Sequence, residues 1–302
     1  MCSTCGDGTL DPVSSKPTGG PGTTVDDAGR ATAAVESAAR LAGDLAAAAG
    51  VRVQSLTTPT EQHVAAAVLQ QVWGHADGVP LPPEMLRAFA FTGNYVGAAF
   101  DGDQIVGVAC AFRTNHGSLH SHIAGVLPSH QGHAIGYLLK LHQRAWALAN
   151  GITSIVWTFD PLIRRNAYFN LVKLGADAVR YLADFYGVMT DQINAGDVSD
   201  RLLVEWDLSQ PVPGAYLPTG ANAVTVLRPG SGGEPVLRPG SDGVRLIKVP
   251  EDIDAVRRVD PALATRWRSA LRRTMTEAFD SGLVIVGLNQ DKAYVARRKE
   301  PR

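Results

Sequence analysis

Hydrophobic and polar positions follow one pattern before residue 51 and another after it. Residues 26–50 are rich in alanine and carry a thin apolar stripe at helical spacing, which predicts a helix with little surface to bury. From residue 51 onward, alternating or short apolar runs predict strands, and runs with a period of three to four residues predict helices. Residues 51–208 are thereby predicted to have the order βααβββαβαββ, a mixed α/β unit in which some strands must be parallel.

Several of these elements carry signals at their ends. Thr58 and Glu61 have the spacing of a capping box, with Pro59 in the first turn of the helix. Gly151 and Gly175 are placed to terminate two later helices. The predicted strands cover 51–58, 94–100, 104–112, 118–128, 154–160, 178–187 and 201–208, and the predicted helices cover 58–74, 82–93, 134–151 and 164–175.

The flanking segments differ from this unit in composition. Residues 1–25 are rich in Gly, Ser, Thr and Pro, which predicts a disordered tail. Residues 209–242 read as a linker with an internal duplication, VLRPGSGGEP followed by VLRPGSDGVR, which predicts a duplicated surface loop. Residues 243–302 contain an amphipathic helix and two strands, and we expect this C-terminal extension to pack on the core or to extend its sheet.

Composition narrows the class of protein. The 302 residues are 45% hydrophobic and 19% charged, with a net charge of -1, so no strongly basic balance indicates nucleic acid or an anionic membrane as partner. No apolar run approaches the roughly 20 residues of a membrane span, and the N-terminus has no apolar signal region. We therefore expect a cytoplasmic protein; the oligomeric state is left open.

Three cysteines are too few for a disulfide framework. Cys2 and Cys5 form a CxxC pair in the tail, but no second pair of ligands accompanies it, so a zinc or redox role is disfavoured. Cys110 lies within an apolar strand and is predicted to be a buried thiol, and no histidine is spaced to activate it.

The stretch VLPSHQGHAIGYLLK, residues 126–140, reads as the end of a strand, a polar turn and the start of a helix. Backbone N–H groups at a helix start lack partners and carry the positive end of the helix dipole, so they bind phosphate oxygens. Gly132, Ala134 and Gly136 are small, as a close approach of a ligand to the backbone requires. An ordinary strand-to-helix turn is the alternative, but the residue pattern favours a pyrophosphate cradle.

The turn, in this order of elements, resembles the GNAT superfamily of acyl-CoA N-acyltransferases. Gln131, Ala134 and Gly136 occupy the key positions of the family signature Q/R-x-x-G-x-G/A, and Ala134 departs from the usual glycine. The stretch RRNAYFNLVKLGA resembles the family's second motif. WTFDPL, NAYFNLVKLGA and DRLLVEW together are similar to a group of predicted acetyltransferases. The resemblance covers residues 51–208.

The resemblance implies a GNAT-like fold, a mixed and largely antiparallel sheet with splayed central parallel strands, flanked by helices and followed by the C-terminal α/β extension. It implies acetyl-CoA as co-substrate and no metal. A bulge at Gly125 would splay the fourth strand from the fifth, and the Val126 N–H would then support the oxyanion. The implied cofactor-binding residues are Val126, Gln131, Gly132, His133, Ala134, Ile135, Gly136, Asn166 and Asn170.

The opening expected between the splayed fourth and fifth strands is called the wedge. We expect the general base on the fourth strand, before the wedge begins. His120 and His122 share one face of the predicted strand, and histidine has a suitable pKa for taking a proton from an amine. We favour His122 because it lies nearer the wedge. A metal pair would need a third ligand that is not evident, and simple packing on the sheet is the other alternative. His130 and His142 read as surface residues.

The acid is where the chain departs from the family. Counting back from Gly175, the usual tyrosine falls at Leu171, which cannot protonate a thiolate. Tyr168, one turn earlier, is the substitute candidate, although a thiolate can also leave without an acid. Asp160 is a second candidate base, but a helix N-cap fits it better.

These residues predict an N-acetyltransferase that acts on a small amine or an amino-acid-like acceptor by direct transfer. Two rivals stay open: an acyl-CoA sensor without turnover, and a partner-binding protein that uses the C-terminal helix and the duplicated loop. Aromatic residues that could line the acceptor site are Trp73, Tyr95, Trp157 and Tyr186.

Overall fold

The computed structural model describes residues 25–74, 80–187, 198–210, 212, 216–217, 222–240 and 243–298. The Cys2–Cys5 pair, and the predicted tail apart from Val25, lie outside the described residues. The helices are α1 Val25–Ala48, α2 Pro59–Trp73, α3 Pro83–Phe91, α4 Ile135–Ala149, α5 Arg164–Ala167, α6 Ile253–Val259 and α7 Pro261–Asp280. The strands are β1 Arg52–Ser55, β2 Tyr95–Asp101, β3 Gln104–Arg113, β4 Leu119–Val126, β5 Ser154–Phe159, β6 Asp177–Leu182, β7 Arg201–Asp207, β8 Val224–Pro229, β9 Pro235–Leu237, β10 Arg245–Ile247, β11 Leu283–Leu288 and β12 Tyr294–Arg298.

Within the described ranges the strands form one 12-stranded sheet in the order β1-β2-β3-β4-β5-β7-β6-β11-β12-β10-β8-β9. Its pairings are antiparallel except for β4 with β5 and β8 with β10, which are parallel. The predicted mixed, largely antiparallel sheet with a central parallel pair is therefore confirmed. Because the extension joins through β11, which pairs with β6 at Ile285 and Ala178, it continues the sheet of the first unit.

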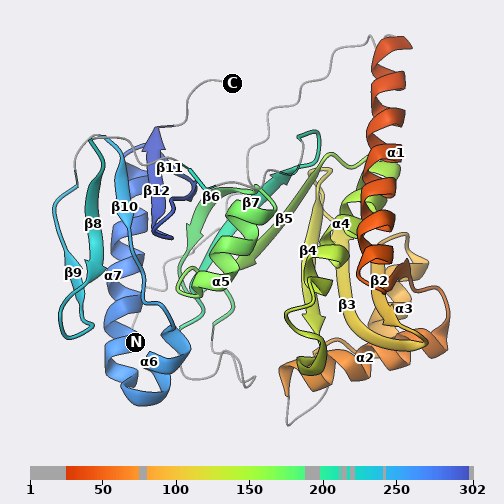
Figure 1. The fold of residues 1–302 in the computed structure, drawn as a ribbon, viewed down its shortest axis with the longest axis horizontal. Coiled ribbons are helices and arrows are strands. Elements are labelled where there is room, and N and C mark those ends of the chain that lie inside the picture. Colours follow the sequence, from red (N-terminus) through yellow and green to blue (C-terminus); the bar gives the residue numbers. More distant parts are fainter. Residues whose placement is uncertain are drawn as a thin grey trace, which may run out of the picture.

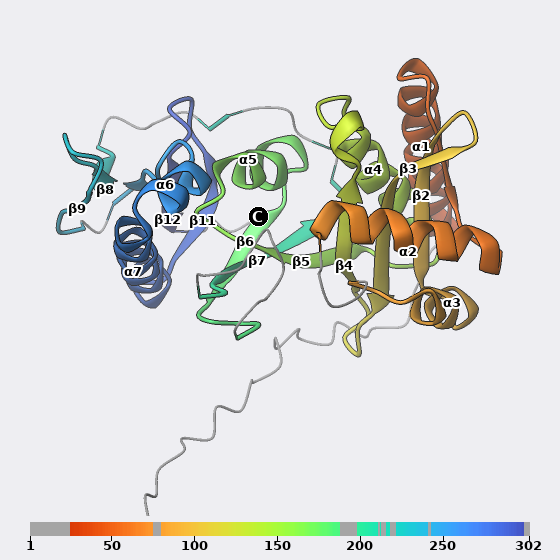
Figure 2. The same ribbon diagram turned by 90° about the horizontal axis from the view of Figure 1, so that it is seen from below.

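Helices cover both faces of the sheet. α4 and α5 lie on one face, while α2, α3 and α7 lie on the other (Figures 1 and 2). α1 runs alongside α4, and Ala38, Ala42 and Ala46 are its buried positions. The weak apolar stripe of residues 26–50 thus packs through small side chains at these three positions.

Local sequence signals account for the start of α2. Thr58 accepts a hydrogen bond from the Glu61 N–H, and the Glu61 carboxylate accepts one from the Thr58 N–H, which completes the predicted capping box. Gly74 then ends the helix in a left-handed conformation.

Two predicted segments differ from the structure. The presumed surface loop of residues 209–242 contains a hairpin, because the two VLRP copies fall on β8 and β9 and pair with Leu227 opposite Leu237. The first copy has apolar side chains that bury in the core, which a linker would leave in water. The single helix expected at 164–175 is a short α-helix followed by a π-helical turn, Tyr168–Lys173.

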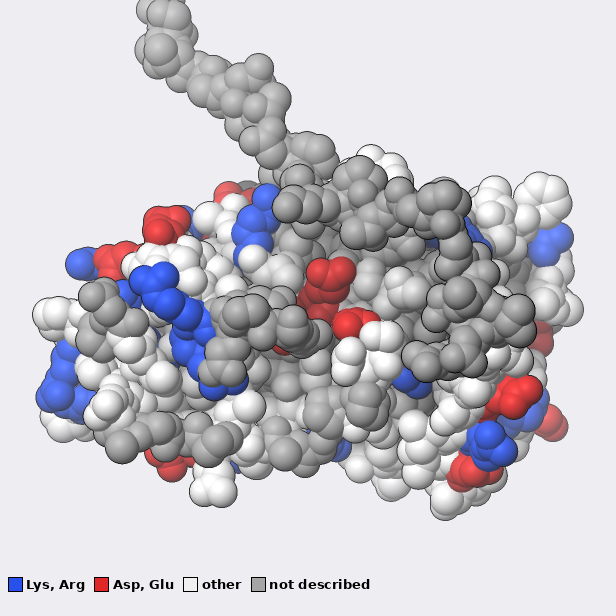
Figure 3. All heavy atoms as spheres, turned by 90° about the horizontal axis from the view of Figure 1, so that it is seen from above, with Lys and Arg blue, Asp and Glu red and all other residues white. Residues whose placement is uncertain are grey.

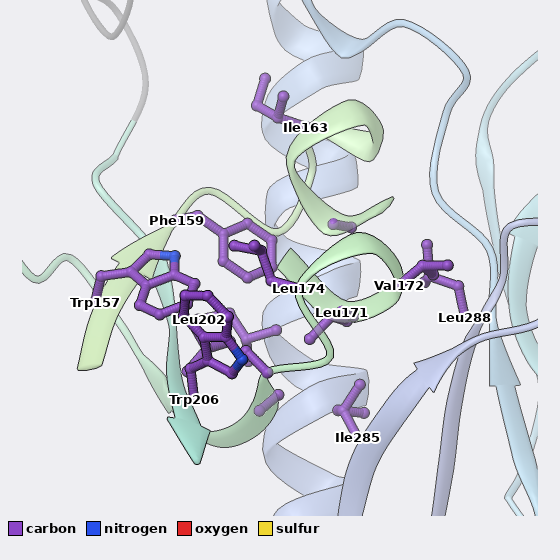
Figure 4. Packing of buried hydrophobic residues seen from close by; sticks show 14 of the residues in the cluster. Trp157, Phe159, Ile163, Leu171, Val172, Leu174, Leu202, Trp206, Ile285 and Leu288 are labelled. Carbon is purple, nitrogen blue, oxygen red and sulfur yellow. The ribbon is translucent and has the colours of Figure 1, made fainter. Parts of the chain in front are cut away.

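The main hydrophobic core runs through the junction between the first unit and the extension. Figure 4 shows Leu171 and Val172 from the π-helical turn beside Ile285 and Leu288 of the extension, all of them buried. Trp157 and Trp206 pack edge to face at 6.3 Å between ring centroids in the same core. One hydrophobic cluster is therefore shared by the first unit and the extension.

Charges of both signs are interspersed on the face shown in Figure 3, in keeping with the net charge of -1. None of the helices in the described ranges combines the length and the apolarity needed to cross a membrane.

Candidate active site

The central feature of the site is a wedge between β4 and β5. The two strands pair only at Leu119 with Ile155 and at His120 with Val156, and then diverge. A cavity of about 760 Å³ opens where they part, within the usual range for small-molecule sites. The splay that the family resemblance implied is therefore present.

The bulge lies upstream of the predicted position. Cys110 and Ala111 are adjacent on β3, and they pair with Ile123 and Ser121 of β4. His122 lies between these two partners, so it is the extra residue that forms the bulge. Gly125 pairs regularly with Val108. A Cβ atom on Gly125 would lie 2.3 Å from the Trp73 ring, so this glycine makes room for α2. The prediction of a bulge at Gly125 is therefore wrong, because Gly125 keeps the regular register and the extra residue is His122.

The free edge of β4 offers backbone donors to the wedge. The Leu127 N–H donates to the Val106 carbonyl at 2.9 Å, toward β3. Successive N–H groups of a strand point to opposite edges, so the Val126 N–H faces the wedge. The Val126 carbonyl faces it too and accepts a hydrogen bond from Gln131 Nε2 at 3.3 Å. Ala124, two residues earlier, presents its N–H at the same edge and was not singled out from the sequence.

The turn after β4 carries a row of backbone donors. Across the described chain, no acceptor lies within hydrogen-bond distance of the N–H groups of residues 132–136. Gly132 has φ 87° and Ala134 has φ 60°, and an alternation of left-handed and right-handed residues is the backbone pattern of anion-binding nests. Five unpaired N–H groups at the start of α4 fit a pyrophosphate. Gln131, which precedes them, lines the cavity, and His133 is exposed on the turn.

The left-handed backbone conformation at residue 134 can be tested by substituting Ala134. Glycine is the usual residue at this position of the family signature, and the left-handed φ of 60° at Ala134 is a conformation that glycine adopts without steric cost. A left-handed alanine costs about 1–2 kcal/mol, and glycine returns about 0.5–1 kcal/mol of this as chain entropy. We expect Ala134→Gly to raise the free energy of unfolding by about 0.5–1 kcal/mol in urea titrations. Ala47→Gly, at an exposed position of α1, should instead lower the free energy of unfolding by about 1 kcal/mol. A lower free energy of unfolding in Ala134→Gly than in wild type would contradict the strained conformation.

The two strand histidines lie on the α3 side of β4. Their rings contact the Phe112 ring, at 4.9 Å for His120 and 5.7 Å for His122 between centroids. His122 lines the cavity, whereas His120 is not among the described lining residues. Burial, with smaller contributions from His122 and Lys140, lowers the pKa of His120 to about 4, and partial burial lowers that of His122. Both rings are therefore neutral at pH 7. Within the described residues, no three His, Cys, Asp or Glu side chains are grouped as metal ligands.

The other predicted residues separate into two sets. Asn166 and Asn170 line the cavity, and Asn170 Oδ1 accepts a hydrogen bond from Trp157 Nε1 at 3.1 Å. Tyr168 does not line it, because its ring packs at 5.6 Å from Tyr216. Leu171 is a core residue (Figure 4). Thus neither the tyrosine nor the leucine points into the described cavity.

Four further expectations meet different outcomes. Cys110 is confirmed as a buried free thiol, and burial raises its pKa to about 12. His142 is not a surface residue, because it is half-buried and hydrogen-bonded to the Tyr95 hydroxyl at 2.9 Å. His130 is likewise half-buried, with Nε2 3.3 Å from Asp101.

Trp73, Trp157 and Tyr186 line the cavity, whereas Tyr95 belongs to the core on the α4 side.

Asp160 is held by the extension. Its carboxylate accepts hydrogen bonds from Arg268 at 2.6 and 2.7 Å, from Arg257 at 2.8 Å and from the Leu162 N–H at 2.9 Å. Burial alone would raise the pKa of Asp160, but the two guanidinium groups hold it at about 2. The carboxylate thus holds the turn after β5, but it is not the expected helix N-cap, because Ile163 is the N-cap of α5, and its arginine partners leave it unsuited to act as a base.

Sequence reasoning missed Lys140. It lies on α4, is 6% exposed and lines the cavity. Its Nζ donates to Ser121 Oγ at 2.7 Å and to Gln143 Oε1 at 3.3 Å. A lysine three residues from a glutamine within an amphipathic helix pattern gave no signal of burial.

Comparison with known proteins decides the family. Residues 65–171 match the model of the acetyltransferase (GNAT) family. This part of the chain is a GNAT acetyltransferase domain. It contains the wedge, the N–H row, both strand histidines and Lys140.

Solved structures similar to this chain include GNAT proteins. They include the ribosomal-protein-S18-alanine N-acetyltransferase from Escherichia coli, at 14% identity and a TM-score of 0.44, covering 55% of this chain and 99% of that one. A GNAT acetyltransferase from Streptococcus pneumoniae has 15% identity and a TM-score of 0.43, covering 54% of this chain and 99% of that one. A GNAT acetyltransferase from Elizabethkingia anophelis, solved with acetyl-CoA bound, has 13% identity and a TM-score of 0.40, covering 52% and 98%. No curated protein matches the chain.

Proposed function

We propose that the chain transfers an acetyl group from acetyl-CoA to the amine of a small or amino-acid-like acceptor. The observation that carries this proposal is the row of five unpaired N–H groups at residues 132–136, next to the wedge of a GNAT domain. Solved GNAT relatives bound to acetyl-CoA, such as the one from Elizabethkingia anophelis, favour this nucleotide. In this proposal the amides hold the pyrophosphate, and Asn166 and Asn170 contact the chain that leads to the thioester.

Acyl transfer to an amine requires support for a developing oxyanion and removal of a proton from the amine. The N–H groups of Ala124 and Val126 are the backbone donors that face the wedge, and we assign the oxyanion to them. His122 is the base in this proposal because it lies on the bulge at the cavity wall and is neutral at pH 7. The acceptor would enter past Trp73 and Tyr186, which line the same cavity.

Titration of acetyl-CoA into the purified protein, followed by a screen of amine acceptors, tests the proposal. Micromolar binding with consumption of acetyl-CoA in the presence of an amine supports an acetyltransferase. Binding without turnover across the screen would favour the acyl-CoA sensor instead, a rival to which the position of Tyr168 away from the cavity lends some weight. Absence of binding would overturn the proposal.

His122→Ala is expected to lower kcat/KM by about 10²-fold or more, because a positioned base contributes about 10²–10⁴-fold. The affinity for acetyl-CoA should change less than twofold. Because burial lowers the pKa of His122, the rate should fall on the acid side only below about pH 6.5, where the ring becomes protonated. His116→Ala, in the exposed β3–β4 turn, serves as the matched control. Full activity in His122→Ala would remove this histidine from the mechanism.

A further inference from the structure

Lys140 places a cation at the apex of the wedge. Its Nζ lies 2.7 Å from Ser121 Oγ on β4 and 3.8 Å from the centre of the Trp157 ring on β5. Ser121 and Trp157 directly follow His120 and Val156, the last residues that pair the two strands. The ammonium therefore bridges β4 and β5 at the point where they part.

The side chains around this lysine accept hydrogen bonds from an ammonium, whereas burial disfavours its charge. Ser121 Oγ, Gln143 Oε1 and the Trp157 ring all act as acceptors toward an ammonium. No Asp or Glu of the described chain forms an ion pair with Lys140. Burial lowers the pKa of Lys140 to about 7. A cation held by neutral groups next to a cavity is an unmatched charge that an anion can complement.

Such an arrangement is costly if its only purpose is packing. An apolar side chain of similar volume would fill this position without the desolvation cost of a charge. Gln143 adds to that cost, because it is fully buried and its Nε2 has no partner in the described structure. The pair therefore indicates a function at the apex of the wedge.

We propose that the Lys140 ammonium faces the sulfur of CoA in the wedge and stabilises the thiolate as it leaves. This inference rests on the proposed function, since it needs a thioester between β4 and β5. The amine nitrogen gives one proton to His122, which passes it to water, and forms a bond to the carbonyl carbon; the carbon–sulfur bond breaks and its electron pair stays on sulfur. Lys140 then gives a proton to the sulfur, which leaves as the thiol, and recovers a proton from water. The step supplies the acid that neither Tyr168 nor Leu171 provides in the described cavity.

Other ionisable groups face the same space and must be separated from Lys140. From β4, His122 lines the cavity, and His120 does not line it but is close enough for Lys140 to contribute to its lowered pKa. The remaining ionisable side chains that line the cavity are Asp160, Arg165, Tyr186, Arg201 and Arg257. Because each is unchanged in a Lys140 variant, a difference between variant and wild type reports on Lys140.

The test is the thiol pKa of bound CoA, followed by the ultraviolet absorbance of the thiolate as the pH is raised. Complexes with desulfo-CoA provide the blank, which removes the absorbance of tyrosines. In Lys140→Met, a neutral side chain of similar length replaces the cation. A cation within about 4–6 Å lowers the pKa of an acid by about 1–3 units. We expect the thiolate to form at least about one pH unit lower in wild type than in Lys140→Met, and below the value of about 8.5 for a free thiol.

Controls separate this role from a structural one. Ser121→Ala removes a hydrogen bond of Lys140 but keeps its charge, so most of the pKa shift should persist. Equal thiol pKa values in wild type and Lys140→Met, with CoA bound to both, would overturn the inference and leave the proposed function intact. Failure of CoA to bind wild type would overturn both. If Lys140→Met does not fold, wild type alone decides, because a bound thiol with a pKa at or above that of free CoA contradicts the role of Lys140.

Discussion

Replacing Gly136 with tryptophan is expected to raise the Kd for acetyl-CoA by at least about 100-fold. Gly136 lies in the first turn of α4, and an added Cβ atom would meet only Val126 Cγ2, at 4.0 Å. An indole attached there would project toward the edge of the wedge and between the ligand and the N–H row. Loss of two hydrogen bonds to a charged group, each contributing about 1.5–3 kcal/mol, already accounts for a change of this size. Isothermal titration calorimetry with acetyl-CoA and with free CoA measures it.

Gly43→Trp is the matched control, because Gly43 lies within α1 and an added Cβ atom would have no neighbour within 4 Å. Both variants introduce the same side chain into a helix, and only one of them faces the cradle. Both should keep the circular dichroism spectrum of wild type. Unchanged binding in Gly136→Trp would show that the pyrophosphate does not lie against the residue 132–136 amides.

Features that depend on neighbouring residues could be predicted from the sequence. The α2 capping box needs only Thr58 and Glu61 at the right spacing, and both hydrogen bonds of the box form. The order of strands and helices through residue 208 follows from short periodic runs, and the structure has the same order. The turn at residues 131–136 was recognised because small residues and a helix start are adjacent in the chain.

Features that depend on distant contacts could not be predicted. The register of β4 on β3 places the bulge at His122 and not at Gly125, and Gly125 instead makes room for Trp73, which is far away in the sequence. Spacing counted from Gly175 assumed an α-helix, but the π-helical turn changes which side chains share a face. Lys140 occupies a position that looks polar in the helix pattern, and only the Trp157 ring on another strand shows that it is buried. For Gly125 and Lys140 the neighbours concerned, Trp73 and Trp157, lie on different elements.

Asp160→Ala is expected to lower the free energy of unfolding by about 3–5 kcal/mol, the usual cost of breaking a buried ion pair on one side. Arg268, whose side chain is 2% exposed, donates two hydrogen bonds to this carboxylate, so the variant removes both of them together with the negative charge beside a buried guanidinium. The two hydrogen bonds join α7 to the turn that follows β5. Their loss should therefore weaken the attachment of the extension to the GNAT domain. Urea unfolding followed by tryptophan fluorescence measures the change.

Glu277→Ala is the comparison, because the Arg273–Glu277 pair has the same chemistry on the exposed surface of α7, with side chains 68% and 56% exposed. That pair should contribute less than about 1 kcal/mol. The double variant Asp160→Ala with Arg268→Met should recover part of the loss, since it removes the buried charge along with its partner.

The pH dependence of stability gives an independent check on the same carboxylate. Arg268 and Arg257 hold the pKa of Asp160 at about 2 against the effect of burial, below its ordinary value of 3.8. A group with a depressed folded-state pKa stabilises the protein above its unfolded pKa and loses that contribution as the pH falls toward the folded value. The difference in stability between wild type and Asp160→Ala should therefore be constant above about pH 5 and shrink between pH 3.8 and 2. A difference that stays constant through this range would mean that packing around residue 160, and not the charge, joins the extension to the domain.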